Sequence, residues 1–360
     1  MVIIAQLEPR NRQSLWTQFQ YALELSGDET EEEAPALMEV CTENVQVTRQ
    51  LQTAEGTSPP NLTGQLERAE GTCCLSVTDQ RRLPEAIDSH FHLDRTRTYF
   101  RLPAHTTVTD VIRQASPCDG MHVDLVGTVP VFCDPDTYPT LDTIKDLTRQ
   151  GHTVAVGLHP KQAARCTDAD LTTFGSLLTA PETVGFGEVG LDETVGDDDY
   201  RRQFDILDRI LPHLEDRHVL ILHCREARNS SDGHVYHALL ELLKPVVHPH
   251  HPIHLHCFCG GKSVVDNWLN NFPRTYFGFT QMAGQFKGTK LDGLRSISPD
   301  RLLLETDAPY FPFRELSHSS TPALIGMTAR TVARQLGMDW TELLRQCTDN
   351  AKCLYGWSPQ

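Results

Sequence analysis

The sequence predicts an α/β fold, a (β/α)8 TIM barrel over residues 85–357, preceded by an acidic and largely flexible segment over residues 1–84. Two observations favour the barrel. Short apolar segments typical of buried parallel strands recur along 85–357, most of them separated by a segment of helical length. Nearly every strand is apolar at its start and polar at its end, as in barrel enzymes, whose functional side chains lie at the carboxyl ends of the strands. An open, doubly wound sheet has the same local pattern and stays the structural alternative.

Residues 1–84 differ in composition from the rest of the chain. They contain an acidic run at 28–33, the turn-rich stretch EGTSPPNLTG and one predicted helix over 12–25, with weak periodicity elsewhere. We therefore expect this part to be flexible or accessory, and to form a region separate from the barrel.

Three of the first four predicted strands carry ligand-type side chains near their carboxyl ends. Residues two apart in a strand share a face, so His90 and His92 point the same way at the end of the first strand. Glu188 lies near the end of the fourth, and His159 near the end of the third. The four segments are EAIDSHFHL (85–93), DLVGTVPVFC (124–133), TVAVGLHP (153–160) and TVGFGEVGLD (183–192).

The last four predicted strands continue the pattern. His223 and Arg225 share one face of the fifth strand, His256 lies on the sixth, and Asp307 on the eighth with Glu305 beside it. The helical segment DYRRQFDILDRILPHLEDR precedes the fifth strand. The four segments are VLILHCRE (219–226), PIHLHCFCG (252–260), TYFGFT (275–280) and RLLLETDAP (301–309).

If the strand ends converge on one mouth, six ligand-type side chains surround a single point. A lone HxH pair, or one strand-end histidine, is more often a hydrogen-bonded core residue, but six such residues on five strands point to metal binding. Six ligands are too many for one tetrahedral ion, and they suit two ions about 3.5–4 Å apart that share a carboxylate. The six residues are His90, His92, Glu188, His223, His256 and Asp307.

Seven ordered stretches resemble a known family. They are IDSHFHLD, GLHP, FGEVGLD, LHCREA, HCFCGG, LLLETDAPYF and NAKCLYGW. Residues 85–357 are similar in this order to the TatD family of metal-dependent deoxyribonucleases, which belongs to the amidohydrolase-like barrels. The resemblance does not extend to residues 1–84.

The resemblance implies roles for the six ligands. His90, His92 and Asp307 would hold one divalent ion, His223 and His256 a second, and Glu188 would bridge the two. The family implies Mg²⁺, whereas four imidazoles favour Zn²⁺ or Mn²⁺, so the two ions are expected to be Mg²⁺, Mn²⁺ or Zn²⁺.

The resemblance also implies hydrolysis of phosphodiester bonds in DNA, with RNA as a possible substrate, from the 3′ end as a 3′–5′ exonuclease. In the resulting hypothesis the two ions activate a water, Glu188 and Asp307 are the catalytic carboxylates, and Asp307 takes the proton of the water. His159 and Arg225 are expected to contact the substrate phosphate. An ion pair with Glu226 is the structural alternative for Arg225.

Several neighbouring residues are expected to have structural roles. In the tract VVHPHHPIHLHCFCGG, His254 is expected to line the barrel with a hydrogen-bond partner, and His248, His250 and His251 to lie in a loop at the opposite end. Strand parity turns Cys257 and Cys259 away from His256, and with Cys224 they are expected to be packing thiols. Glu305 would either orient a ligand histidine or make an inward structural pair.

Charge restricts the possible partners. The chain has 48 acidic and 32 basic residues, a net charge of −16, whereas a protein that grips long duplexes by many phosphates is basic. We therefore expect a short contact with nucleic acid at the barrel mouth. The loop ETVGDDDY, which follows GEVGLD where the family has an aromatic residue, is expected to bring four acids close to that mouth, namely Glu193, Asp197, Asp198 and Asp199.

Two other functions remain open at this point: hydrolysis of a small amide, lactone or phosphoester on the same barrel, or a catalytically silent scaffold that keeps its metal site. The eleven cysteines include no CxxC pair, no apolar run is long enough to span a bilayer, and the amino terminus lacks a signal-peptide pattern. We therefore expect an intracellular protein, cytoplasmic or nuclear, that is not secreted and has no membrane partner.

Overall fold

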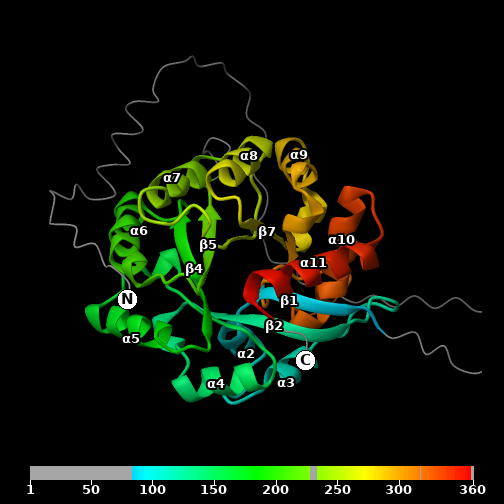
Figure 1. Cartoon of the computed structure of the whole chain (residues 1–360). Helices are drawn as coiled ribbons and strands as arrows, with labels where there is room; N and C mark the ends of the chain where they lie inside the picture. The colour runs from blue at the N-terminus through cyan, green and yellow to red at the C-terminus, as the bar shows by residue number, and fades with distance from the viewer. Residues whose placement is uncertain (1–82, 228–232, 317, 358–360) are drawn as a thin grey trace, which may run out of the picture. The chain divides into compact units, whose positions relative to one another are not determined.

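The computed structural model describes residues 83–227, 233–316 and 318–357. Within them, eight parallel strands form one sheet in the order β1-β2-β3-β4-β5-β6-β7-β8 (Figure 1). The predicted flexible segment, apart from Leu83 and Pro84, and the helix predicted over 12–25 lie outside the described residues. The strands are β1 Glu85–Phe91, β2 Asp124–Phe132, β3 Val154–Val156, β4 Thr183–Asp192, β5 Val219–Arg225, β6 Ile253–His256, β7 Thr275–Phe279 and β8 Leu302–Leu304.

The sheet curls into a nearly closed barrel. Strands β1 to β8 pair with their neighbours in parallel, for example from Gly185 opposite Val219 to Asp192 opposite Arg225 in β4 and β5. The gap between β8 and β1 is bridged by residues at and beyond the strand ends: His92 N donates to Ala308 O at 2.8 Å, and Asp307 N to His90 O at 3.0 Å. The predicted barrel is therefore confirmed, and the open sheet is excluded.

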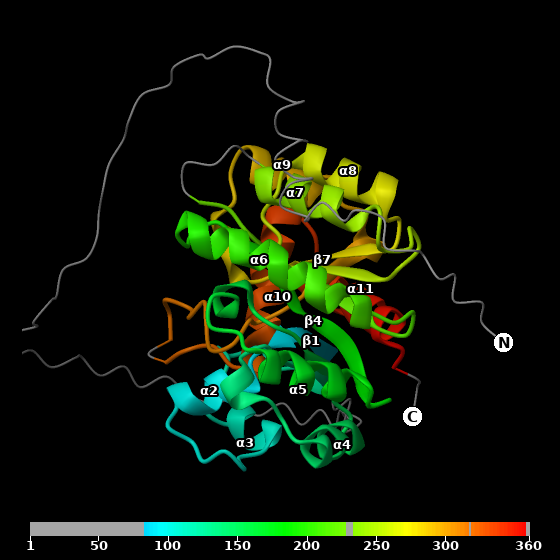
Figure 2. The same ribbon diagram turned by 90° about the vertical axis from the view of Figure 1, so that its left-hand side faces the viewer.

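Helices surround the sheet (Figures 1 and 2). They are α2 Leu93–Tyr99, α3 Val108–Ile112, α4 Leu141–Arg149, α5 Asp168–Leu178, α6 Asp197–Ile210, α7 His234–Leu243, α8 Lys262–Asn271, α9 Thr289–Ser296, α10 Ile325–Leu336 and α11 Trp340–Tyr355. Short 3-10 helices occupy several of the connections: η1 Pro135–Thr137, η2 Pro160–Gln162, η3 Leu211–His213, η4 Gln281–Gln285, η5 Pro299–Arg301 and η6 Pro322–Leu324. None of the helices in the described residues is long and apolar enough to cross a membrane.

The amphipathic pattern of the helices accounts for their position. In α6 the buried side chains Phe204, Leu207 and Ile210 recur every third residue, which gives the helix one apolar face toward the sheet. The three aspartates at 197–199 begin this helix, where negative charge is favoured by the helix dipole.

Three apolar clusters form in the described residues, two of them large, and the smallest includes Met121, Phe313 and Leu324. The largest lies between the outer face of the sheet and the helices. The second fills the barrel interior, where Val131, Ile221 and Leu303 pack with Leu354 and Tyr355 from the end of α11. The end of α11 thus packs into the barrel interior, while the polar strand ends lie at the opposite mouth.

Candidate metal centre

Glu188 is the centre of the predicted metal site. Its carboxylate is almost completely buried, and one ring nitrogen of each of four histidines lies close to it. The distances from the Glu188 oxygens are 3.5 Å to His90 Nε2, 3.7 Å to His92 Nε2, 3.6 Å to His223 Nδ1 and 3.4 Å to His256 Nε2. Four strand ends therefore meet at one carboxylate, as the alternation along the strands predicted.

Asp307 completes the set of six. Its Oδ1 lies 3.3 Å from His92 Nε2, 3.8 Å from His256 Nε2 and 4.0 Å from His90 Nε2. The residue follows β8 in the left-handed region, with a φ of 49°, which a non-glycine residue adopts at some cost in free energy.

The donor atoms of this set fit divalent ions. Glu188 Oε2, His90 Nε2 and Asp307 Oδ1 are buried and have no hydrogen-bond partner within the described residues. Buried polar atoms in proteins are normally satisfied, so these three point to a ligand. Neutral imidazole and carboxylate are the donors that Zn²⁺ and Mn²⁺ accept. The centre therefore suits divalent metal.

The donors also fall into overlapping groups. His90, His92 and Glu188 offer ligand atoms within 4.8 Å of one another, and so do Glu188, His223 and His256. Glu188 is common to both groups, as expected for a shared carboxylate.

Burial and neighbouring charges set the protonation states of these ligands. Burial alone would raise the pKa of Glu188, but the imidazoles of His159 and His223 outweigh it and hold that pKa well below its usual range. Burial, reinforced by His256, lowers the pKa of His90 well below normal. Glu188 is thus an anion and His90 a neutral imidazole, the states in which both bind metal.

Two carboxylates contact candidate ligand histidines at the ring nitrogen that does not face Glu188. Glu305 Oε2 lies 2.8 Å from His256 Nδ1, which leaves His256 Nε2 free to face Glu188. Asp192 Oδ2 lies 3.2 Å from His223 Nε2, which leaves His223 Nδ1 free in the same way. Of the two predictions for Glu305, the orienting role agrees with these contacts, whereas the contribution of Asp192 was missed.

The remaining histidines of the tract lie in the predicted segments, but His251 is not at the surface as expected. His254 is fully buried, and its Nδ1 lies 2.8 Å from Tyr355 Oη, below the metal ligands. His248 and His250 are exposed and His251 is buried in the turn that precedes β6. Of the five histidines in this tract, only His256 lies among the six predicted ligands.

The two predicted phosphate contacts line one polar cleft together with candidate metal ligands. This cleft has a volume of about 650 Å³. His159 Nε2 lies 3.5 Å from Glu188 Oε1, and burial lowers the pKa of His159 to about 3. Arg225 is exposed at the end of β5 and lines the same cleft. Both residues are within the cleft, and their contact with a phosphate stays a prediction.

Arg95 is a further cation of this cleft that the sequence did not indicate. Its Nε and Nη2 form a bidentate pair with Asp134 at 2.6 and 3.0 Å, and its Nη1 lies 3.9 Å from Glu188. Gln162 Nε2 also donates to Asp134, at 2.6 Å. These three side chains lie just beyond the carboxyl ends of β1, β2 and β3. Their position after the strands was the only sequence feature that could have indicated a role in the cleft, because no motif includes them.

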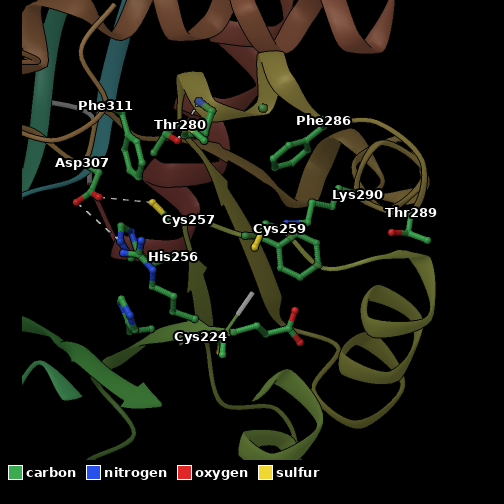
Figure 3. A pocket seen from close by; sticks show the side chains of 17 residues that line it. Cys224, His256, Cys257, Cys259, Thr280, Phe286, Thr289, Lys290, Asp307 and Phe311 are labelled. Atoms are coloured by element: carbon green, nitrogen blue, oxygen red, sulfur yellow. Dashed lines mark hydrogen bonds and ion pairs between the residues drawn. The ribbon is translucent and has the colours of Figure 1, made fainter. Parts of the chain in front are cut away.

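The prediction for Cys257 was wrong. The chain leaves β6 at His256, and Cys257 adopts a φ of 47°, so strand parity no longer applies. Its Sγ lies 3.6 Å from Asp307 Oδ2, beside the metal ligands, as Figure 3 shows. Cys224, Cys257 and Cys259 line a second cavity, next to the polar cleft. All eight described cysteines are free thiols, as predicted for them.

The acidic loop expected close to the mouth has local contacts of its own. Glu193 Oε1 lies 2.6 Å from His234 Nδ1, and Glu193 Oε2 accepts from Ala227 N at 3.2 Å. The three aspartates begin α6, and none of the four lines the polar cleft. Helix initiation and local pairing account for this acidic loop.

Comparison with known proteins agrees with this site. The sequence model of the family described as "TatD related DNase" matches residues 87–356. The chain belongs to this family. The match begins and ends within two residues of the segment 85–357 that resembled it.

Similar proteins carry related names. The human protein "3'-5' RNA nuclease TATDN2" is 30% identical over 284 residues, which cover 75% of this chain and 35% of that protein. This chain therefore spans about a third of that relative. The "3'-5' ssDNA/RNA exonuclease TatD" of Musicola paradisiaca is 30% identical over 207 residues, which cover 55% of this chain and 75% of that protein.

Solved structures share the fold. The TatD homologue YJJV of Escherichia coli K12 superposes with a TM-score of 0.59 at 19% identity, covering 76% of this chain and 98% of that chain. A TatD family hydrolase of Entamoeba histolytica gives a TM-score of 0.56 at 18% identity, covering 76% and 99%.

Proposed function

We propose that this chain is a metal-dependent nuclease that removes nucleotides one at a time from the 3′ end of single-stranded DNA or RNA. The observation that carries the proposal is the cluster of six ligand-type side chains that includes Glu188, in a chain that belongs to a family described as DNases. The 3′–5′ direction and the choice of DNA or RNA come from the names of the relatives.

We infer two divalent ions at the centre. Glu188 belongs to two donor groups, and the atoms His90 Nε2, Glu188 Oε2 and Asp307 Oδ1 lack partners among the described residues. When bound, two such ions supply a water of lowered pKa and positive charge that offsets the charge on the phosphoryl oxygens.

The residues of the chain would do the rest of the chemistry. Asp307, whose Oδ1 has no partner within the described part of the chain, accepts the proton of the attacking water. His159 and Arg225 hold the phosphate from the side of the polar cleft. Glu305 and Asp192 keep His256 and His223 in the tautomers that leave one nitrogen free for metal. The bond that breaks joins phosphorus to the 3′-oxygen of the penultimate nucleotide, and a nucleoside 5′-monophosphate leaves.

The test is release of label from 3′-labelled single-stranded DNA and RNA. The wild-type chain and Glu188→Gln are compared after EDTA treatment, with Mg²⁺, Mn²⁺ or Zn²⁺ then added back. Glu215→Gln is the matched control, because the Glu215 side chain is exposed and pairs with Arg217 and not with any candidate ligand. A closed circular strand, which has no 3′ end, distinguishes exonuclease from endonuclease action.

The expected result is metal-restored release of mononucleotides by the wild type and by Glu215→Gln, with at least about 100-fold less from Glu188→Gln. The circular strand should resist. If no ion restores cleavage although elemental analysis finds bound metal, the nuclease proposal is wrong and a small-molecule substrate takes its place.

A further inference from the structure

A second cavity adjoins the metal ligands. It has a volume of about 650 Å³ and shares His223, Arg225, His256, Asp307 and Phe311 with the polar cleft. Because the two hollows have these residues in common, a molecule held at the ligands can extend into either one.

The second cavity has a different chemical character from the cleft. Figure 3 shows His256 and Asp307 at one end and Lys290 beyond Phe286 at the other. The remaining walls are mostly apolar and sulfur-containing, with Met282, Cys257 and, beside Asp307, the ring of Phe311. The volume lies in the range of about 300–1,000 Å³ typical of small-molecule sites.

The backbone around this cavity is held in unfavourable conformations. Four non-glycine residues have a positive φ in the described part of the chain, and three of them line the cavity: Cys257 at 47°, Asp307 at 49° and Phe311 at 53°. Such conformations gather at ligand sites, where the surrounding fold maintains them.

Phe311 is the most informative of the three. A phenylalanine gains nothing from a positive φ, and its ring belongs to none of the apolar core clusters found in the described residues. Its side chain is half-buried and lines both hollows beside Asp307. Core packing therefore does not explain why the ring is held there.

We propose that this cavity, which we call the terminal-base pocket, binds the base and sugar of the 3′-terminal nucleotide while its 5′-phosphate lies at the metal ligands. The inference rests on the proposed function. Phosphate at the ligand end and a base against Phe311 and Phe286 match the order of groups in a nucleotide, and Arg225 at the shared rim adds positive charge for the strand.

The pocket accounts for the removal of one nucleotide per turnover. Every base has an aromatic face, so stacking on phenylalanine selects no sequence. Hydrolysis joins the oxygen of water to phosphorus and releases the 3′-oxygen of the upstream strand, so the phosphate stays with the nucleotide in the pocket. One nucleoside per turnover then leaves as its 5′-monophosphate.

The first test pairs a protein change with a substrate change. Phe311→Gly removes the ring, and glycine adopts the positive φ readily, so the backbone should not be strained further. The substrates are a single strand with a normal 3′-terminal nucleotide and one whose terminal sugar lacks its base. KM and kcat are measured with the metal that restores activity.

Loss of one stacked base is worth roughly a 10-fold change in KM. We expect Phe311→Gly to raise KM about 10-fold for the normal strand and less than about 2-fold for the base-less one, because both changes remove the same contact. Phe311→Tyr should restore the wild-type KM. Tyr99→Ala removes an exposed ring of α2 that lines neither hollow, and should change nothing.

The second test does not depend on turnover. In saturation-transfer NMR, the base protons of deoxyadenosine 5′-monophosphate should receive saturation from the wild type and lose most of it with Phe311→Gly. If the wild type binds this nucleotide through its base but cleaves no strand, the pocket stands and the nuclease proposal fails. If it cleaves strands while base protons receive no saturation, or KM rises equally for both substrates, the pocket is refuted and the nuclease proposal stands.

Discussion

Substitution of Glu305 measures how much metal binding by the candidate ligands depends on the carboxylates that contact their histidine rings. Its Oε2 lies 2.8 Å from His256 Nδ1, its Oε1 accepts from Cys257 N at 2.5 Å, and the side chain is fully buried. In Glu305→Gln one of the two oxygens becomes an NH2 group. One of the two donors then faces another donor and loses its acceptor.

The expected cost has two parts. A buried donor without an acceptor lowers the free energy of unfolding by about 1–3 kcal/mol. Loss of the group that orients a ligand histidine lowers metal affinity by roughly 10–100-fold, which corresponds to about 1.4–2.7 kcal/mol of binding free energy. The glutamine variant should therefore be both less stable without metal and a weaker metal binder.

The two parts are measured separately. Urea unfolding in EDTA gives the stability, and competition with a chelator of known affinity gives the metal dissociation constant. The exposed control Glu215→Gln should leave both quantities unchanged. If Glu305→Gln folds and binds metal within about 2-fold of the wild type, the argument that Glu305 fixes the tautomer of His256 is wrong.

Two further predictions concern stability. Leu354→Ala opens space in the barrel interior where α11 packs, and should lower the free energy of unfolding by about 3 kcal/mol. The control Val246→Ala, at an exposed position, should lower it by less than about 0.5 kcal/mol. Equal urea midpoints for the two variants would contradict this prediction. Burial lowers the pKa of His152 to about 4, below the value of about 6.5 in an unfolded chain, so the unfolded state binds more protons in that interval. Stability should therefore fall as pH drops from about 6.5 to about 4, by at most about 3 kcal/mol from this residue and less with solvent screening; His152→Gln should flatten the decline, and an unchanged pH profile would refute the assignment.

The strands and the candidate ligands that lie on them were predictable because both depend on local periodicity, whereas His92 and Asp307 lie beyond the ends of β1 and β8. Apolar runs marked the strands, and alternation assigned His90, His92 and His256 to one face. In a closed barrel, all side chains on that face of a strand point toward the barrel axis. Residues on the strands therefore had their positions determined by parity alone.

The alternation of side chains no longer predicts their direction once the chain has left a strand. Cys257 comes one residue after β6 ends, in a left-handed conformation, and no feature of the sequence indicates that its thiol turns toward Asp307. Arg95 and Asp134 pair across loops after different strands, and Asp192 meets His223 only through the register of β4 and β5. Such contacts depend on the closed fold.

Composition did not indicate where the acidic loop becomes helical. The run at 197–199 has the charge of a loop near the mouth, yet it serves to begin α6. Composition alone does not distinguish a solvated loop from the first turn of a helix.

The contact between His254 and Tyr355 affects the order in which the candidate metal centre is completed during synthesis. Tyr355 lies 101 residues after His254, and His254 Nε2 lies 3.5 Å from Glu305, the residue that orients His256. At a synthesis rate of about 5–20 residues per second, the chain passes through roughly 5–20 seconds in which His254 exists without its partner. Every candidate ligand is translated within that interval or before it, so the centre gains its full support only after the messenger has been read past α11.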